Sequence, residues 1–570
     1  MTSPSERPQA SDHAASAVPA PAARALSLDH AAWLVAALIL FAIVVDQIRR
    51  EGTFRVDDAY ITFSFSKNLG TGHGPVFSHG VRVEGYSNFL WMVIVALRYV
   101  FVKQGDPYGY ARFVAFCCLA VTLVSTYRIA RRGARPLFSL VAVALLVCCS
   151  DLFRAAASGL ETSAYVAAII TGWSVYLAED PKRRRWSLLA FAPAALMRID
   201  GFVPLLIVFG VETMASLFER RFSFVKLARW AAPAFVLWGA YFAWRYTYYG
   251  LPLPTTYYAK LTVNINDPDR AFRQVWEFLR DYGAAPLLAL LVVPLVRGPR
   301  REAASLAVAI VLQISYVMSV GGDWMPFSRF FLPVVPAAAV LAAYGCEQVW
   351  QMTTMLEAWP AWATRVVTVS ALAFSAEHMH SAWTDTPIEA DKLGNAAHVE
   401  SHTVNNLLGA KELMSYVVRR PGDRLITDYP GVFSVFTDAE IIDVWGLCNT
   451  DIALHGDVQG INPIYGKSCP ECYARAKPDY LHIGVPMLRP ENAFNDMSQI
   501  IPNIFHGAEI DRIVRLRHHF GVGRVVVEAT GQALWFLERR RAELPLETRR
   551  PAPGVRVDYP FESDEQQRAQ

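Results

Sequence analysis

Long apolar stretches dominate the first two thirds of the chain and predict membrane helices. A helix needs about 20 apolar residues to cross the hydrocarbon core of a bilayer. Candidate segments lie at 31–48, 88–103, 110–130, 136–151, 163–178, 186–217, 229–246, 283–297, 301–320, 328–350 and 361–376. The segment 186–217 carries Arg198 and Asp200 in its middle, so we expect two short helices with a polar turn there. The total is about 11–12 membrane segments.

The pattern changes near residue 380, where short apolar runs predict strands that alternate with helices. The runs lie at 424–427, 440–444, 479–483 and 524–528, and a helix is expected at 402–419. The fold class that follows is a polytopic α-helical membrane protein with a C-terminal soluble α/β domain.

Domain limits follow from these changes in pattern. We expect a membrane domain at 29–378 and a soluble domain at 379–545. The Ala-, Pro- and Ser-rich residues 1–28 predict a disordered cytoplasmic tail, and the charged residues 546–570 predict a second disordered tail.

Clusters of Lys and Arg indicate which loops face the cytoplasm, because cytoplasmic loops are enriched in basic residues. Such clusters lie at 131–135, 182–185, 220–226 and 297–301. Alternation then places outside the loops at 158–161, 248–260 and 321–329, together with everything after 376.

One region conflicts with simple alternation. A cytoplasmic amino terminus places the loop at 49–87 outside, whereas counting back from the first basic cluster places it inside. The intervening segment 88–103 is short and contains Arg98, so we expect it to be re-entrant or interfacial rather than fully spanning.

Composition agrees with a membrane protein. Of 570 residues, 53% are hydrophobic and only 18% are charged, with a formal net charge of +3. The basic residues lie in short clusters, which is not typical of a nucleic-acid surface. Cys469 and Cys472 stand in polar sequence without a second Cys or His pair, so a disulfide is favoured over a metal site, with Cys448 as a competing partner.

The first external loop, 49–87, carries the strongest candidate chemistry. Asp57 and Asp58 are adjacent just outside a membrane helix, where each carboxylate raises the pKa of the other unless a cation or a proton is shared. Such a pair could provide a general base or hold a divalent cation such as Mg²⁺ or Mn²⁺. Alternatively, both residues cap a helix that begins at Ala59. His73 lies in a Gly-rich turn and could contact a substrate or only shape the turn.

The run 57–91 resembles the signature of the bacterial GT-C superfamily, closest to the arabinofuranosyltransferase B-like branch of mycobacterial cell-wall enzymes. The segments 159–162, 197–201, 249–260 and 321–331 strengthen the resemblance, which covers the membrane region in order. The soluble domain matches only loosely, and Met197 to Asp200 depart from the expected Arg-Pro-Glu-like run.

The resemblance implies a glycosyltransferase in the bacterial inner (plasma) membrane, with its active site and C-terminal domain on the periplasmic side. The donor would be a polyprenyl-phosphate-linked sugar, possibly arabinofuranose, and the acceptor an envelope glycan, lipid or protein. Carried over to this chain, the catalytic carboxylates are Asp57 and Asp58.

Other polar and aromatic residues of the external loops are candidate substrate ligands. Lys260, Arg329 and Arg198 could bind the departing phosphate. Asp323 and Glu161 could orient the acceptor or pair with those cations. The remaining candidates could contact the sugar or the lipid, although aromatic residues also form the belt at any membrane interface; they are Glu84, Tyr86, Tyr257, Tyr258 and Trp324.

Two other functions fit a chain of this kind. A transferase that acts on lipid A or on protein would share the fold but not the acceptor. A transporter or flippase would also have about a dozen helices, but it typically shows inverted repeats and charges at mid-membrane, whereas here the notable charges lie at helix ends.

Overall fold

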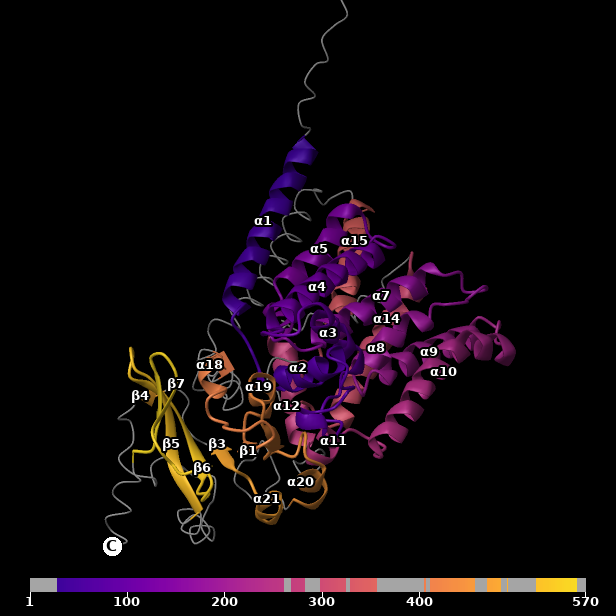
Figure 1. Cartoon of the computed structure of the whole chain (residues 1–570). Helices are drawn as coiled ribbons and strands as arrows, with labels where there is room; N and C mark the ends of the chain where they lie inside the picture. The colour runs from indigo at the N-terminus through magenta and orange to yellow at the C-terminus, as the bar shows by residue number, and fades with distance from the viewer. Residues whose placement is uncertain are drawn as a thin grey trace, which may run out of the picture.

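The computed structural model of the chain describes residues 28–260, 268–281, 298–323, 329–355, 404–405, 408, 411–456, 469–482, 489–490 and 519–560. A helical part, coloured indigo to salmon in Figure 1, continues into an α/β part coloured orange to yellow. This arrangement confirms the predicted fold class.

The helical part begins with α1 (Leu28–Glu51), α2 (Asp57–Gly70), α3 (Phe89–Phe101), α4 (Tyr108–Ala130), α5 (Pro136–Val147), α6 (Ser150–Ala157) and α7 (Thr162–Ala178). It continues with α8 (Ala192–Met197), α9 (Phe202–Phe218), α10 (Phe224–Tyr249), α11 (Thr255–Lys260), α12 (Pro268–Asp281), α14 (Arg300–Ser319) and α15 (Val334–Met355). The short turns η1 (Ser78–Gly80) and η2 (Leu189–Phe191) complete it. The predicted segments at 283–297 and 361–376 lie outside the described residues.

The observed helix lengths indicate which predicted segments could cross a membrane. Within the described residues, α4 and α14 are long and apolar enough to cross a bilayer, and the pair α5 and α6, bent by 56°, would form a third span. The predicted break in 186–217 is present, because α8 ends at Met197 and α9 begins at Phe202. With 13 residues, α3 rises about 20 Å, less than the roughly 30 Å of hydrocarbon, which agrees with a segment that does not fully cross.

Ion pairs join the predicted cytoplasmic loops at one end of the helical part. Glu212 near the end of α9 accepts from Arg184 at 2.7 Å, from Arg221 at 2.6 Å and from Arg301 at 3.3 Å. Arg132 reaches Glu302 at 3.3 Å. The basic clusters therefore share one face, as alternation requires.

The α/β part is built on an eight-stranded sheet within the described residues, in the order β2-β1-β3-β6-β5-β8-β7, with β4 also paired to β6. The strands are β1 (Arg424–Thr427), β2 (Glu440–Asp443), β3 (Tyr480–His482), β4 (Arg489–Pro490), β5 (Phe520–Val527), β6 (Gln532–Arg539), β7 (Arg549–Ala552) and β8 (Val555–Asp558). Its helices are α18 (Lys411–Met414), α19 (Pro430–Phe436), α20 (Thr450–His455) and α21 (Pro470–Ala476).

The parallel strands β2, β1 and β3 coincide with three of the predicted runs, and Leu425 lies opposite both Ile441 and Tyr480. One limit is corrected: the predicted disordered tail at 546–570 contains β7 and β8. Strand β8 pairs with β5, which places the buried Val557 opposite Val525, and β7 pairs with β8. The sequence did not predict these strands because they contain charged residues. Arg549, Arg556 and Asp558 are only partly buried, and Arg556 forms an ion pair with Asp558. Within 402–419 the described helix is only α18.

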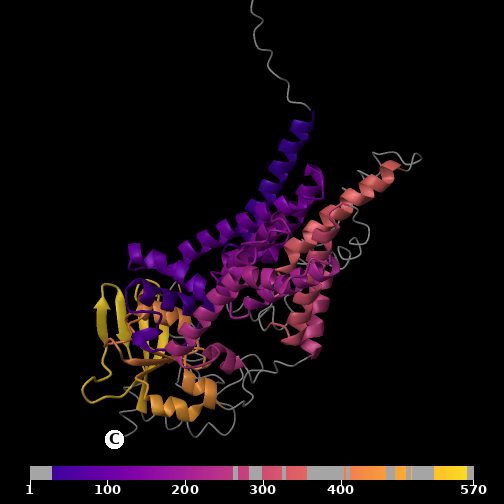
Figure 2. The ribbon, with the colours of Figure 1, turned by 90° about the vertical axis from the view of Figure 1, so that its right-hand side faces the viewer.

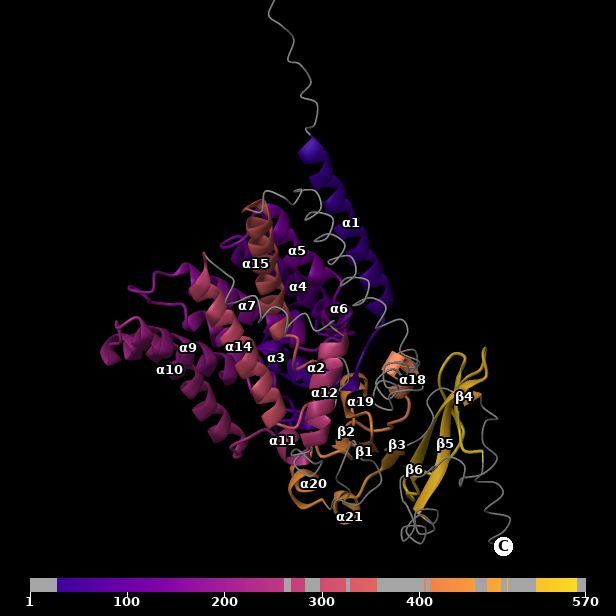
Figure 3. The same cartoon turned by 180° about the vertical axis from the view of Figure 1, so that it is seen from behind.

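The two parts share one core. Helix α19 packs directly on α2, so that Phe433 of the α/β part and Tyr60 of α2 belong to the same buried cluster. Figures 2 and 3 show the orange α/β elements lying against the indigo loop that precedes α3. A Cβ at Gly431 would stand 2.3 Å from the Asp57 carbonyl oxygen, so only glycine permits this approach.

Candidate functional site

A polar pocket lies where the external loops of the helical part meet the α/β part. Its lining brings together residues from α2, the loop before α3, the turns before α7 and after α8, helix α11 and the segment before α15. The polar lining residues are Asp58, Thr62, Tyr86, Ser87, Asn88, Glu161, Arg198, Thr256, Lys260 and Arg329. Five site residues proposed from sequence, together with Arg198, therefore share one pocket.

Asp58 is the second residue of α2 and is half-buried in the pocket wall. Its carboxylate accepts no hydrogen bond from the residues that the structure describes. Opposite charge is close, because Asp58 acts electrostatically on Lys260. A carboxylate that is open to a pocket is placed where it can accept a proton from a bound ligand.

Asp57 points elsewhere. Its two carboxylate oxygens accept the backbone N–H groups of Gly431 at 2.9 Å and Val432 at 2.8 Å, in the first turn of α19. Burial raises the pKa of Asp57 to about 8, although these two hydrogen bonds oppose the shift. Asp57 does not line the pocket. The two adjacent carboxylates therefore have different environments: Asp58 lines the pocket, whereas Asp57 is bound to α19.

A buried ion network supports the membrane side of the pocket. Arg198 donates to Glu161 at 3.0 Å and to Asp200 at 2.8 Å, and Asn88 donates to the other oxygen of Glu161 at 2.9 Å. Tyr316 donates to Asp200 at 3.1 Å. Arg198 is therefore held by two carboxylates at the break between α8 and α9, where a continuous helix could not present it.

A second cation of the pocket, Arg329, forms a bidentate ion pair with Asp323. Arg329 donates from Nε to Asp323 at 2.7 Å and from Nη2 at 2.9 Å. The Asp323 backbone N–H in turn donates to Gln274 of α12 at 2.7 Å. Asp323 therefore orients Arg329, the second of the two roles that its sequence position suggested.

Lys260 ends α11 and adds a third cation. Burial lowers the pKa of Lys260, and the charge of Asp58 opposes that shift. The pocket thus contains three cations and two carboxylates, Asp58 and Glu161. Asp200 and Asp323, which are outside the lining, also pair with Arg198 and Arg329, so a ligand anion would be bound by N–H donors of the lining cations and not by a net positive charge.

Other candidates lie outside the pocket lining. Glu84 is buried in an ion pair with Arg245, which anchors the loop to α10. His73 is exposed and hydrogen-bonds Thr71 within its turn at 2.9 Å. Tyr257 and Tyr258 contact each other edge-on near the pocket. Trp324 lies outside the described residues.

The α/β part contributes a residue that the sequence did not reveal. Leu447 lines the pocket from the loop after β2. Asp443, fully buried at the end of β2, fixes this loop by accepting the N–H groups of Trp445 at 2.9 Å and Cys448 at 2.7 Å. An Asp at the end of a predicted strand followed by Gly446 was the available signal, since this pairing is typical of tight turns.

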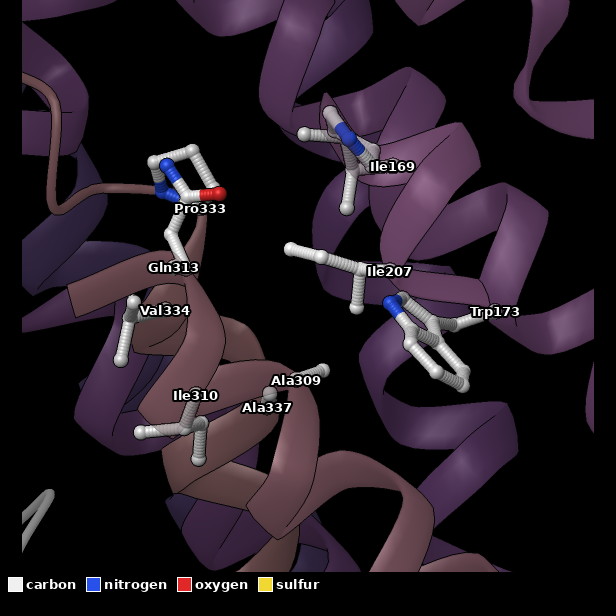
Figure 4. Close-up of a pocket in the computed structure, with 10 residues that line it drawn as sticks. Ile169, Trp173, Ile207, Ala309, Ile310, Gln313, Pro333, Val334 and Ala337 are labelled. Carbon is white, nitrogen blue, oxygen red and sulfur yellow. The ribbon is translucent and has the colours of Figure 1, made fainter. Parts of the chain in front are cut away.

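An apolar pocket lies beside the polar one. Figure 4 shows Ile169, Trp173 and Ile207 facing Ile310 and Val334 across it, with Gln313 as its polar edge. Phe330 lies between residues of the two pockets: the Arg198 guanidinium lies 4.7 Å from its ring centroid, and its carbonyl oxygen accepts from Gln313 at 3.4 Å.

The side chains that could bind a metal ion are dispersed among the described residues. These residues contain no group of three or more His, Cys, Asp and Glu residues arranged to bind one ion. Asp57 faces α19 rather than Asp58, so the proposed metal pair is not formed. Cys469 and Cys472 are joined in a disulfide, while Cys448 is a free buried thiol.

No protein-family model and no curated protein matches this chain. Solved structures do match. ArnT from Cupriavidus metallidurans bound to undecaprenyl phosphate superposes with a TM-score of 0.52 at 12% identity, covering 79% of this chain and 93% of ArnT. This chain has a GT-C fold.

Two further structures match this fold less closely. ArnT from the same organism in the apo state gives a TM-score of 0.49 at 12% identity, covering 89% of this chain and 98% of that one. The apo oligosaccharyltransferase of Archaeoglobus fulgidus gives 0.47 at 10% identity, covering 90% and 75%. The match to ArnT bound to undecaprenyl phosphate supports the GT-C resemblance at the level of fold, and the arabinofuranosyltransferase branch is not confirmed.

Proposed function

We propose that this GT-C chain is a glycosyltransferase that moves a sugar from a polyprenyl-phosphate donor to a hydroxyl of a cell-envelope acceptor. The observation that carries the proposal is the pocket in which Asp58 faces Arg198, Lys260 and Arg329. A base and a set of phosphate-binding cations in one pocket are what transfer from a sugar phosphate requires.

The chemistry follows from the charges. Asp58 accepts the proton of the acceptor hydroxyl, and the hydroxyl oxygen forms a bond to the anomeric carbon of the donor. The bond between that carbon and the phosphate oxygen breaks, and the phosphate leaves with the electron pair. Arg329 and Lys260 offset the developing negative charge, and Asp323 keeps the Arg329 fork fixed during the step.

The neighbouring apolar pocket supports a lipid carrier. An isoprenoid chain needs apolar surface near its phosphate, and Phe330 contacts both Arg198 of the polar pocket and Gln313 of the apolar one. The ArnT structure with a similar fold holds undecaprenyl phosphate. We propose the same class of carrier here.

The face of the membrane follows from the charges as well. Helix α9 begins at Phe202, close to Arg198, and carries Glu212 with its three arginines ten residues further on, about 15 Å along the helix axis. If the arginine-rich end is cytoplasmic, the pocket faces the periplasm of the bacterial inner membrane. Arabinofuranose as the donor sugar rests on the sequence resemblance alone.

The test is sugar transfer by the purified protein from a panel of radiolabelled polyprenyl-phosphate sugars. We expect one donor to be used, and Asp58→Asn to reduce kcat by about 10²–10⁴-fold. Asp46→Asn provides a matched control, since Asp46 lies in an exposed α1 ion pair with Arg50. Turnover of no donor, or full activity of Asp58→Asn, would refute the proposal.

A further inference from the structure

Asp57 connects the catalytic loop to the α/β part. It precedes Asp58 in α2, yet both of its oxygens are engaged by the first turn of α19, 374 and 375 residues later in the chain. The side chain is only 6% exposed. This contact leaves no oxygen of Asp57 directed at the polar pocket.

Helix geometry explains the division. Adjacent residues of an α-helix point about 100° apart, because one turn takes about 3.6 residues. When Asp57 is held against α19, Asp58 must therefore point about a quarter-turn away, which is the direction of the pocket. The rotation of α2 about its axis decides where the Asp58 carboxylate lies.

Further contacts fix α2 and the following loop to the same domain. Lys67 near the end of α2 donates to the Val435 carbonyl oxygen at 3.1 Å. The Ile441 N–H donates to Ser78 Oγ at 2.8 Å. The α/β part thus contacts the catalytic loop on both sides of Asp58, and Asp57 is the contact nearest to it.

We infer that Asp57 is a positioning residue. Its contact with α19 sets the rotation of α2 about its axis and thereby directs the Asp58 carboxylate into the pocket. The α/β part is then a component of the catalytic centre. This inference rests on the proposed function. Its physical reason is that a general base must come within about 2.6–3.2 Å of the proton it accepts. A displacement of about 1 Å can cost about 10²-fold in rate.

A positioning role for Asp57 can be distinguished from a role as a second general base. If Asp57 acted on substrate directly, its effect would be independent of α19. If it acts through α19, a change at Gly431 must produce the same defect, although Gly431 is in the other domain and carries no functional group. A Cβ at Gly431 would lie 2.3 Å from the Asp57 carbonyl oxygen and 2.6 Å from the Ile61 nitrogen, and would push the two helices apart.

The experiment is a double-mutant cycle on the full-length protein with Asp57→Asn, Gly431→Ala and both together. We expect each single variant to lower kcat by about 10–100-fold, with the donor KM changed less than about 2-fold, because the three cations stay in place. The double variant should match the single variants, since both changes break one contact. Additive losses, or full activity of Gly431→Ala, would overturn the inference.

Two controls keep the result interpretable. Gly109→Ala in α4 adds a methyl group that meets no atom within 4 Å, so its kcat should equal that of the wild type. If Gly431→Ala fails to fold, Lys67→Met replaces it in the cycle, because it removes the bond from α2 to the Val435 carbonyl oxygen of the same helix α19. Loss of transfer in Asp58→Asn with full activity in the Asp57 and Gly431 variants refutes the positioning role alone, whereas an inactive wild type refutes the proposed function.

Discussion

The two walls of the polar pocket differ in kind. The wall from the helical part holds every charged side chain in the lining: Asp58, Glu161, Arg198, Lys260 and Arg329. The wall from the α/β part presents Leu447. Behind the lining, the α/β part contributes backbone N–H groups to Asp57 and a buried carboxylate, Asp443, that shapes its own loop. The helical part supplies the charged groups of the pocket. The α/β part supplies an apolar lining residue and the contacts that hold Asp57 in place.

The difference has a physical cause. A buried charge is tolerated only where partners surround it, and the breaks between helices bring such partners together, as Arg198 with Glu161 and Asp200 shows. Strand ends offer backbone groups and tight turns instead. The division predicts that substitutions in the first wall act on stability and on the chemical step, whereas those in the second act on acceptor fit.

The largest effect is expected at Arg198. Replacement by Gln leaves Glu161 and Asp200 without their cation, and breaking a buried pair costs about 3–5 kcal/mol. We expect Arg198→Gln to lower Tm strongly and to abolish transfer. Thermal unfolding in detergent, with Arg198→Lys as the charge-preserving control, measures this. A fully stable Arg198→Gln protein would contradict the described network.

At Arg329 we expect a loss of rate with little loss of stability. Lysine keeps the charge but loses the planar fork that Asp323 holds. Arg329→Lys should reduce kcat by about 10–100-fold, and Asp323→Asn should act in the same direction. Steady-state kinetics against donor concentration checks both; unchanged kcat in either variant would remove Arg329 from the chemical step.

A smaller effect is expected on the other wall. Leu447→Trp adds volume beside the pocket, and overpacking costs about 1–3 kcal/mol. We expect a rise in the acceptor KM of about 5–10-fold with the donor KM unchanged, while Leu447→Ile should behave like the wild type. If the donor KM rose instead, Leu447 would belong to the donor side and the division between the walls would fail.

The smallest effect concerns pH. The pKa of Asp57 is raised to about 8 and that of Asp443 to about 6, in both cases mainly by burial. Each pKa lies above the ordinary value, so the folded state binds protons that the unfolded state releases, and stability falls as pH rises from about 4 to 8. We expect Tm to fall as pH rises over this range, and to fall less in Asp57→Asn; an equal slope in both proteins would contradict the raised pKa of Asp57.

Patterns of local residues predicted much of the fold. The charges at Arg198 and Asp200 located the break between α8 and α9, and apolar runs located β1, β2 and β3. Counting of basic loops placed Glu161, Lys260 and Arg329 on one side and left the side of Asp58 in conflict, and the structure brings all four residues into one pocket. These features depend on hydrophobic periodicity and on charge, both of which can be read directly from one sequence.

The division of Asp57 from Asp58 could not be predicted in the same way. The alternative considered from sequence began the helix at Ala59, whereas α2 begins at Asp57, so the two carboxylates are subject to helical rotation. Their separation also depends on α19, and no local pattern reports a contact across 374 residues. Leu447 was missed for the same reason, because an apolar residue in a turn has no recognisable chemistry.

The shared core of α2 and α19 has a consequence for biosynthesis. Chains grow at about 5–20 residues per second, so Gly431 leaves the ribosome roughly 20–75 s after Asp57, given their separation of 374 residues. During that interval α2 is already translated while its docking partner does not yet exist. If the proposed function holds, the cations of the helical part are synthesised before α19 can position Asp58, and transfer begins only after the α/β part has folded onto α2.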